Sequence, residues 1–277
     1  MSEAFKKFDL TGKTALVTGG ATGLGYHMAR ALAISGARVV ICARREDVLK
    51  SAVDTLSKDV AGGDILYRTV DLGDRQSIAR LSEYCMGELG GIDIFIGNAG
   101  QDMLQPIEAI TDDAIDQMVQ VNLSANVELV RGFVPHMRQK RWGRILFSSS
   151  ATTVCASPHE GASMYTAVKG ALNSYTRTAA TELGHDGITV NSLILGMFLT
   201  DIMRGVFDQV EQAQGPGAGA AALKSFSSMI ALGRCGEVEE IEGLIQLLAS
   251  DAGSYITGSN LAIDGGLSIM LRPNQPA

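Results

Sequence analysis

The stretch KTALVTGGATGLGYHMARALAISGARVVICAR, residues 13–44, decides the fold. Residues 15–17 and 39–41 form two short apolar runs, which are typical of parallel strands covered on both faces. Between them, residues 24–34 carry apolar side chains at helical spacing. The stretch therefore predicts a strand–helix–strand unit with a glycine-rich turn where the first strand enters the helix.

The glycine turn indicates a nucleotide site. Gly19, Gly23 and Gly25 lie where backbone N–H groups at a helix N-terminus approach a pyrophosphate. Their spacing, G-x-x-x-G-x-G, differs from the more familiar G-x-G-x-x-G. A plain tight loop is the alternative, and the position between strand and helix favours the nucleotide interpretation.

A second signal lies in SMYTAVKGALNSYTRTAATEL, residues 163–183. On a helix, Tyr165 and Lys169 lie on one face because they are four residues apart. A nearby cation lowers the pKa of a phenol from about 10, so the pair is a candidate general acid/base. Alone, this spacing also arises by chance on helices with a solvated lysine.

Further strand-like runs occupy residues 65–70, 94–96, 144–147, 189–194 and 261–263, with helical segments between them. This alternation predicts one α/β domain over residues 1–277, a Rossmann-type doubly wound sheet of about seven parallel strands with helices on both faces. The segment 208–224 contains GPGAGAAA and is expected to be irregular and mobile, within a lid at about 200–229. An idle surface loop is the alternative.

Composition excludes several functions. Of 277 residues, 46% are hydrophobic and 19% charged, an ordinary globular balance, and the net charge is −7 without a basic cluster, which disfavours nucleic acid. No apolar run has the length of a membrane span, and the N-terminus lacks a signal-peptide core, so we expect no membrane partner and a cytoplasmic location. The cysteines and histidines lack metal-ligand spacing, so no metal is predicted.

Several motifs in order resemble the short-chain dehydrogenase/reductase family. They are TGGATGLG, GNAG at residues 97–100, VNL around Asn122, SSS at 148–150, YTAVK, and the ending RCGEVEEIEGLIQLLASDAGSYITGSNLAIDGG. The resemblance covers about residues 8–268.

The resemblance implies four catalytic residues: Asn122, Ser150, Tyr165 and Lys169. Tyr165 would exchange a proton with the substrate oxygen, and Ser150 would donate a hydrogen bond to that oxygen. Lys169 would hold the nicotinamide ribose and lower the Tyr165 pKa. Asn122 would interrupt its helix and hold a water that relays protons to Lys169. Ser149 is the alternative serine, because Ser150 precedes Tyr165 by fifteen residues, about two more than the family pattern.

Glycine spacing, position after strands and the resemblance together give the expected cofactor-binding set. Its members are Gly19, Thr22, Gly23, Leu24, Gly25, Arg44, Arg45, Asp71, Leu72, Asn98, Ala99, Gly100, Tyr165, Lys169, Gly196 and Thr200. Two departures stand out. Gly97 replaces a family asparagine, which is expected to weaken one structural hydrogen bond. Leu195 replaces a proline, which is expected to loosen the turn beside the nicotinamide.

NADP(H) is favoured over NAD(H). Ala43 occupies the position at which an acidic residue would repel a 2′-phosphate. Arg44 and Arg45 follow, and guanidinium groups suit a phosphate. The alternative is that they are solvated and paired with Glu46 and Asp47. The family's other NADP determinant is a basic residue where this chain has Thr22.

The sequence thus predicts an oxidoreductase that interconverts a secondary alcohol and a ketone. The small-molecule substrate is a sugar acid or polyol, or a 3-oxoacyl thioester, contacted by residues 101–104, 151–164 and the lid after Thr200. A non-catalytic regulator that senses dinucleotide is the alternative. By analogy, a homotetramer would assemble through helices at 111–138 and 163–184, with the tail 267–277 packing across a subunit boundary.

Overall fold

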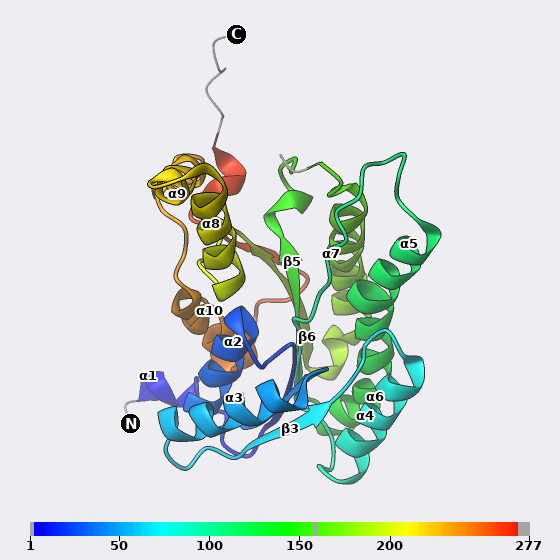
Figure 1. Cartoon of the computed structure of the whole chain (residues 1–277). Coiled ribbons are helices and arrows are strands. Elements are labelled where there is room, and N and C mark those ends of the chain that lie inside the picture. The colour runs from blue at the N-terminus through cyan, green and yellow to red at the C-terminus, as the bar shows by residue number, and fades with distance from the viewer. Residues whose placement is uncertain (1–2, 158–159, 271–277) are drawn as a thin grey trace.

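The computed structural model describes residues 3–157 and 160–270 and contains one seven-stranded sheet (Figure 1). The strands are β1 (Thr14–Thr18), β2 (Arg38–Ala43), β3 (Ile65–Thr69), β4 (Ile94–Gly97), β5 (Gly143–Ser150), β6 (Ile188–Leu195) and β7 (Asn260–Ile263). Their order is β3-β2-β1-β4-β5-β6-β7, and every neighbouring pair is parallel. The predicted doubly wound parallel sheet is confirmed. Two parts of the predicted contact segments, residues 158–159 and 271–277, lie outside the described residues.

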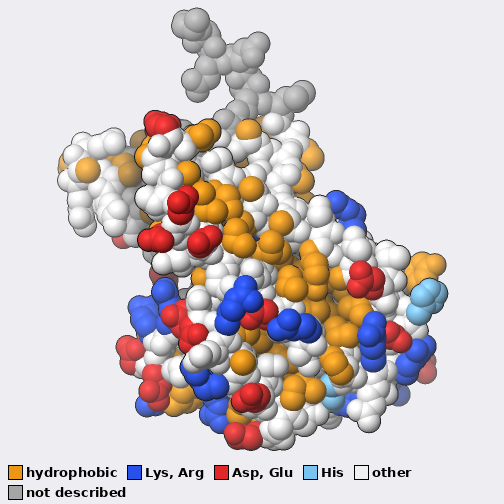
Figure 2. Space-filling view, turned by 90° about the vertical axis from the view of Figure 1, so that its right-hand side faces the viewer, with side chains coloured by type: hydrophobic (Ala, Val, Ile, Leu, Met, Phe, Trp, Pro, Cys, Tyr) orange, Lys and Arg blue, Asp and Glu red, His pale blue; other side chains and the backbone are white. Residues whose placement is uncertain are grey.

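Helices cover both faces of the sheet. On one side lie α2 (Gly23–Ile34), α3 (Glu46–Asp59) and α10 (Glu242–Ala249), and on the other lie α4 (Arg75–Gly87), α6 (Ala125–Lys140) and α7 (Ser163–Leu183). Figure 2 shows the outer surface of the side that carries α4 and α6, where hydrophobic side chains gather in a band bordered by charged ones.

Alternate strand residues build two separate cores. Ala15 and Val17 of β1 pack in the cluster with α2, whereas Leu16 packs in the opposite cluster with α4 and α6. Successive side chains on a strand point to opposite faces, and both faces are covered here. This arrangement is the physical reason for the continuous apolar run that identified the strand.

The predicted interruption at Asn122 is present. The helix α5 (Asp112–Val119) continues through a π-helical turn, Gln120–Ser124, into α6. A single π turn inside a long helix is rare and often accompanies a functional site. It lets the buried Asn122 side chain bond outside its own helix, as described below.

The prediction of an irregular segment at 208–224 is wrong. It consists of α8 (Asp201–Gln214) and α9 (Ala218–Ser227), joined by a short turn in which Gly215 and Gly217 have φ angles of +97° and +89°. Alanine has the highest helix propensity, which outweighs the interspersed glycines. The Glu211 carboxylate accepts hydrogen bonds from the N–H groups of Gly217 and Gly219, both at 2.7 Å, and so fixes the turn.

Within the described residues 3–157 and 160–270, no helix combines the length and hydropathy needed to cross a membrane. The same part of the chain holds no group of three or more His, Cys, Asp or Glu side chains placed to bind a metal ion. The carboxyl ends of the strands meet at one edge of the sheet, which is where ligands bind in open α/β folds.

Candidate active site

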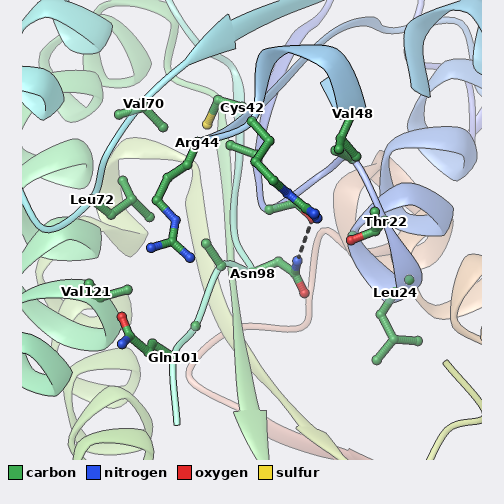
Figure 3. Close-up of a pocket in the computed structure, with 18 of the residues that line it drawn as sticks. Thr22, Leu24, Cys42, Arg44, Val48, Val70, Leu72, Asn98, Gln101 and Val121 are labelled. Atoms are coloured by element: carbon green, nitrogen blue, oxygen red, sulfur yellow. Dashed lines mark hydrogen bonds between the residues drawn. The ribbon is translucent and has the colours of Figure 1, made fainter. Parts of the chain in front are cut away.

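A cavity of about 460 Å³ lies at the carboxyl ends of the strands (Figure 3). Thirteen of the predicted cofactor residues line it: Gly19, Thr22, Gly23, Leu24, Gly25, Arg44, Arg45, Asp71, Leu72, Asn98, Ala99, Gly100 and Thr200. Tyr165, Lys169 and Gly196 are not part of this lining. The apolar side chains of Val48, Val70 and Val121 also line the cavity and were not predicted, because no local motif marks them.

The glycine turn fits a pyrophosphate group. A Cβ on Gly25 would lie 2.1 Å from the carbonyl oxygen of Gly19, so only glycine permits this approach of helix to turn. Gly19 and Gly23 adopt φ angles of +65° and +53°, which favour glycine. Thr22, the N-cap of α2, makes no side-chain capping bond. The first N–H groups of α2 therefore face the cavity without a side-chain cap and suit an anion.

Arg44 and Arg45 are exposed at the end of β2, and Figure 3 shows Arg44 in the cavity wall near Cys42 and Val70. Among the described residues, neither arginine forms an ion pair. Glu46 bonds instead to Lys50, with 2.9 Å between Oε1 and Nζ. The alternative in which Glu46 neutralises the arginines is therefore not present here, and both guanidinium groups are available to an anion.

Asn98 ties three strand ends together beneath the cavity. The Thr18 hydroxyl accepts bonds from the N–H groups of Asn98 and Ala99, both at 3.0 Å. The Asn98 amide donates to the Thr18 carbonyl at 3.1 Å and accepts from the Ser148 hydroxyl at 3.0 Å. These contacts hold the loop after β4 against β1 and β5.

The glycine at position 97 is matched by an asparagine on α6. A Cβ on Gly97 would lie 2.0 Å from Oδ1 of Asn126. The Asn126 amide in turn donates to the Asn122 carbonyl at 2.8 Å. The space that a side chain at 97 would need is thus filled by Asn126, which also supports the π turn. Although Gly97 departs from the family pattern, Asn126 keeps this region packed and hydrogen-bonded.

Lys169 is buried between the ends of β4 and β5. Its Nζ donates to the Ser148 carbonyl at 2.8 Å, and a Cβ on Gly100 would lie 3.0 Å from it. The same Nζ lies 5.8 Å from the centroid of the Tyr165 ring. The predicted pair therefore converges, and it does so next to the loop that borders the cofactor cavity.

The three consecutive serines at the end of β5 have different partners. Ser148 and Ser149 are buried, and their hydroxyls donate to Asn98 and to the Lys169 carbonyl, respectively. Ser150 alone is hydrogen-bonded to the Tyr165 hydroxyl. This contrast favours Ser150 over Ser149 as the partner of the tyrosine.

The pKa of Tyr165 is raised, whereas the sequence analysis predicted that Lys169 would lower it. Burial raises it above its usual value, the hydrogen bond with Ser150 acts to lower it, and the charge of Asp102 raises it further. Lys169 is not among these influences, so the expected lowering by the lysine is not what this geometry produces. Burial lowers the pKa of Lys169 to about 8, although the charge of Asp102 raises it. For both groups, burial is the largest cause of the pKa shift.

Asn122 fastens the loop after β4 to the π turn. Its Oδ1 accepts from the Gln101 N–H at 3.2 Å, and its Nδ2 donates to the Gln101 carbonyl at 2.8 Å. Nδ2 also donates to the Met118 carbonyl at 3.0 Å. Asn122 thus holds the Gln101 backbone close to Lys169. The sequence analysis did not predict this role.

The turn after β6 is firmly held despite Leu195. Leu195 is paired with both Ser150 and Ile263 in the sheet, and the Gly196 N–H donates to the Ile263 carbonyl at 3.1 Å. A Cβ on Gly196 would lie 2.5 Å from the Cα of Asp264. Thr200 caps α8 by accepting from the Met203 N–H at 3.3 Å. The expected loosening of this turn is therefore not seen.

Comparison with known proteins gives a consistent result. The family described as short chain dehydrogenase matches residues 13–211. D-beta-hydroxybutyrate dehydrogenase of Rhizobium meliloti (strain 1021) is 31% identical over 260 residues, covering 92% of this chain and 98% of that protein. The 3-oxoacyl-[acyl-carrier-protein] reductase FabG of Pseudomonas aeruginosa is 31% identical over 258 residues, covering 93% and 98%.

Among solved structures, L-sorbose reductase from Gluconobacter frateurii, complexed with NADPH and L-sorbose, superposes with a TM-score of 0.90. Its sequence is 28% identical, and the match covers 96% of this chain and 100% of that one. The likeness therefore extends over the sheet, the cavity and the helices that cover them.

Proposed function

Because this chain belongs to the short-chain dehydrogenase/reductase family, we propose that it is an NADP(H)-dependent oxidoreductase that interconverts a secondary alcohol and a ketone. The observation that carries the proposal is the convergence of Tyr165, Ser150 and Lys169 beside a glycine-lined anion cradle. A dinucleotide sensor would need the cradle but not the hydrogen-bonded tyrosine and serine.

The residues divide the chemistry between them. The Ser150 hydroxyl donates a hydrogen bond to the substrate oxygen, where negative charge develops during reduction. Tyr165 gives its proton to the same oxygen and recovers one for the next turnover. The bound dinucleotide supplies or accepts the hydride.

Lys169 and Asn122 support this proton transfer. One N–H of the Lys169 ammonium is used by the Ser148 carbonyl, which leaves two donors for the nicotinamide ribose and for a water. Asn122 holds the π turn and the Gln101 backbone beside that ammonium. We propose that protons pass from this water through Lys169 toward Tyr165.

The preference for NADP(H) rests on the unpaired guanidinium groups of Arg44 and Arg45 and on the absence of a carboxylate at Ala43. Replacing both arginines by alanine is expected to lower kcat/KM for NADPH by roughly 10- to 100-fold, with little change for NADH. Steady-state kinetics with each dinucleotide measures this. Arg38→Ala removes an exposed guanidinium from the opposite end of β2 and should leave the NADPH/NADH ratio unchanged. A wild-type preference for NADH contradicts the assignment.

The activity itself is tested by a panel of ketones with product identification. NADPH oxidation coupled to formation of a secondary alcohol supports the proposal. Tight NADPH binding without turnover of any carbonyl compound would favour the sensor instead. The names of the relatives include a hydroxy acid, an acyl-carrier thioester and a ketose, so sugar acids, polyols and thioesters all belong in the panel.

The homotetramer stays a proposal by analogy with the family, with contacts through the helices at 111–138 and 163–184. The cytoplasmic location stays a prediction from the sequence.

A further inference from the structure

Ser150, the serine that meets Tyr165, also caps the short turn that follows β5. The turn is a 3₁₀ helix, Ala151–Thr153, and Ser150 is its N-cap in an extended conformation. The Ser150 Oγ accepts from the Thr152 N–H at 3.3 Å and from the Thr152 hydroxyl at 3.1 Å. A serine at a cap commonly accepts from the backbone in this way, and here the same residue adds a second donor from its side chain.

These two bonds determine where the proton of the Ser150 hydroxyl points. A serine hydroxyl has one proton to donate and two lone pairs with which to accept. Thr152 occupies both lone pairs, so the bond between Ser150 and the Tyr165 hydroxyl uses the Ser150 proton. In agreement with this direction, burial raises the pKa of Tyr165, whereas the bond from Ser150 acts to lower it. A bond donated to the phenol oxygen has this effect because it stabilises the phenolate.

The turn after β5 is anchored to the helix that carries Tyr165. The Thr153 hydroxyl donates to the Ser150 carbonyl at 2.7 Å and accepts from the Asn173 amide at 2.9 Å. Asn173 is buried on α7, about two helical turns after Tyr165. Its Oδ1 accepts from the buried Ser192 hydroxyl of β6 at 2.7 Å. One chain of hydrogen bonds therefore fixes the turn relative to the tyrosine.

We propose that Thr152 is a positioning residue for the reaction: its two hydrogen bonds hold the Ser150 hydroxyl so that the proton of this hydroxyl faces the substrate oxygen. The inference rests on the oxidoreductase function proposed above and adds a residue that acts through Ser150. Negative charge develops on the substrate oxygen during reduction, and a donor that already points there need not reorient. Without the Thr152 hydroxyl, one lone pair of Ser150 becomes free and its proton can turn elsewhere.

Thr152→Val tests this role, because valine has the shape of threonine without the hydroxyl. Thr152 is half-buried and lines a second cavity of about 460 Å³, so the change needs no repacking of a closed core. With NADP⁺ and the secondary alcohol that the ketone panel yields, kcat should fall about 3- to 10-fold, the effect of one hydrogen bond. The rise of kcat/KM with pH should move up by about half a unit to one unit, because the phenolate loses part of its stabilisation.

Two further measurements separate positioning from a structural role. Thr152→Ser keeps the hydroxyl and should retain the wild-type pH profile. NADPH affinity of Thr152→Val should stay the same, because Thr152 does not line the cofactor cavity. Thr166→Val is the matched control: it removes a hydroxyl from the lining of the same second cavity, next to Tyr165 in the chain, and should leave the pH profile unchanged.

A double substitution shows whether Thr152 acts through Ser150. In a Ser150→Ala background, Thr152→Val should cause no further fall in kcat and no further shift in pH, because the oxygen that it holds is gone. Equal effects of Thr152→Val in the wild-type and Ser150→Ala backgrounds would overturn the inference.

The inference is also overturned if Thr152→Val leaves kcat and the pH profile unchanged. A shift of the rise to lower pH overturns it as well, since Thr152 would then accept from Ser150 and draw its proton away. The near-ultraviolet absorbance of the Tyr165 phenolate, taken as the difference from Tyr165→Phe with NADP⁺ bound, reports the same pKa without turnover. NADPH binding with no turnover of any ketone therefore overturns the oxidoreductase function, while this titration still decides the role of Thr152.

Discussion

The two halves of the cleft are built in different ways. In the cofactor half, glycines are required by contacts with backbone and core: a Cβ on Gly20 would lie 2.7 Å from Ile41, and one on Gly25 would lie 2.1 Å from Gly19. On the substrate side, Gly205 of α8 would meet nothing within 4 Å. A side chain is thus excluded at Gly20 and Gly25, whereas one fits at Gly205.

The substrate half also leaves apolar side chains in solvent. They come from the loop after β4, the loop after β5 and α8, and they are Leu104, Ile107, Val154 and Val206. In our proposal, backbone groups of the glycine turn hold the pyrophosphate, whereas exposed side chains decide what the substrate half binds.

The largest effect is expected where the two halves meet. Tyr165→Phe removes the hydroxyl that we propose exchanges a proton with the substrate, so kcat should fall about 10²- to 10⁴-fold. NADPH affinity should stay within roughly twofold, because Tyr165 does not line the cofactor cavity. Single-turnover kinetics and fluorescence titration measure the two quantities. A kcat within roughly tenfold of wild type refutes the acid/base role.

The contrast between the two halves is tested by replacing one glycine with alanine in each half. Gly25→Ala should destabilise the fold by about 1–3 kcal/mol, because the new methyl group overlaps the Gly19 carbonyl, and should weaken NADPH binding. Gly205→Ala lies in α8 with open space around it and should stabilise by about 0.5–1 kcal/mol. Urea denaturation with and without NADPH gives both free energies of unfolding. If Gly25→Ala and Gly205→Ala changed the free energy of unfolding in the same direction, the two halves of the cleft would not differ in this way.

The smallest expected effect is a pair of shifts, in opposite directions, in the pH at which kcat/KM for alcohol oxidation rises. Alcohol oxidation requires the Tyr165 phenolate, so kcat/KM rises with pH through the Tyr165 pKa. Ser150→Ala removes an interaction that lowers this pKa, and the rise should move to higher pH. Asp102→Asn removes a charge that raises it, and the rise should move to lower pH. Shifts in the same direction for both variants would contradict the assignment of these two neighbours.

Thirteen of the sixteen expected cofactor residues line one cavity, because most of them lie at strand ends or in the glycine turn, where the fold dictates position. That they bind a cofactor stays a prediction. The valines Val48, Val70 and Val121 were missed, since an apolar residue that lines a ligand looks the same in sequence as one that fills a core. The helices α8 and α9 were not predicted, because the glycines in this segment indicate irregular structure. The alanines favour helix instead, and the Glu211 carboxylate fixes the turn by accepting from the N–H groups of Gly217 and Gly219.

The sequence by itself determined the parallel sheet, the glycine turn and the four-residue spacing of Tyr165 and Lys169. These follow from short-range rules, namely side-chain periodicity and the conformational freedom of glycine. Only the tertiary structure decided which serine meets Tyr165, that Asn126 fills the space beside Gly97, and that Asn122 holds the Gln101 backbone. Each of these depends on contacts between segments fifteen or more residues apart, and no local pattern encodes such a contact.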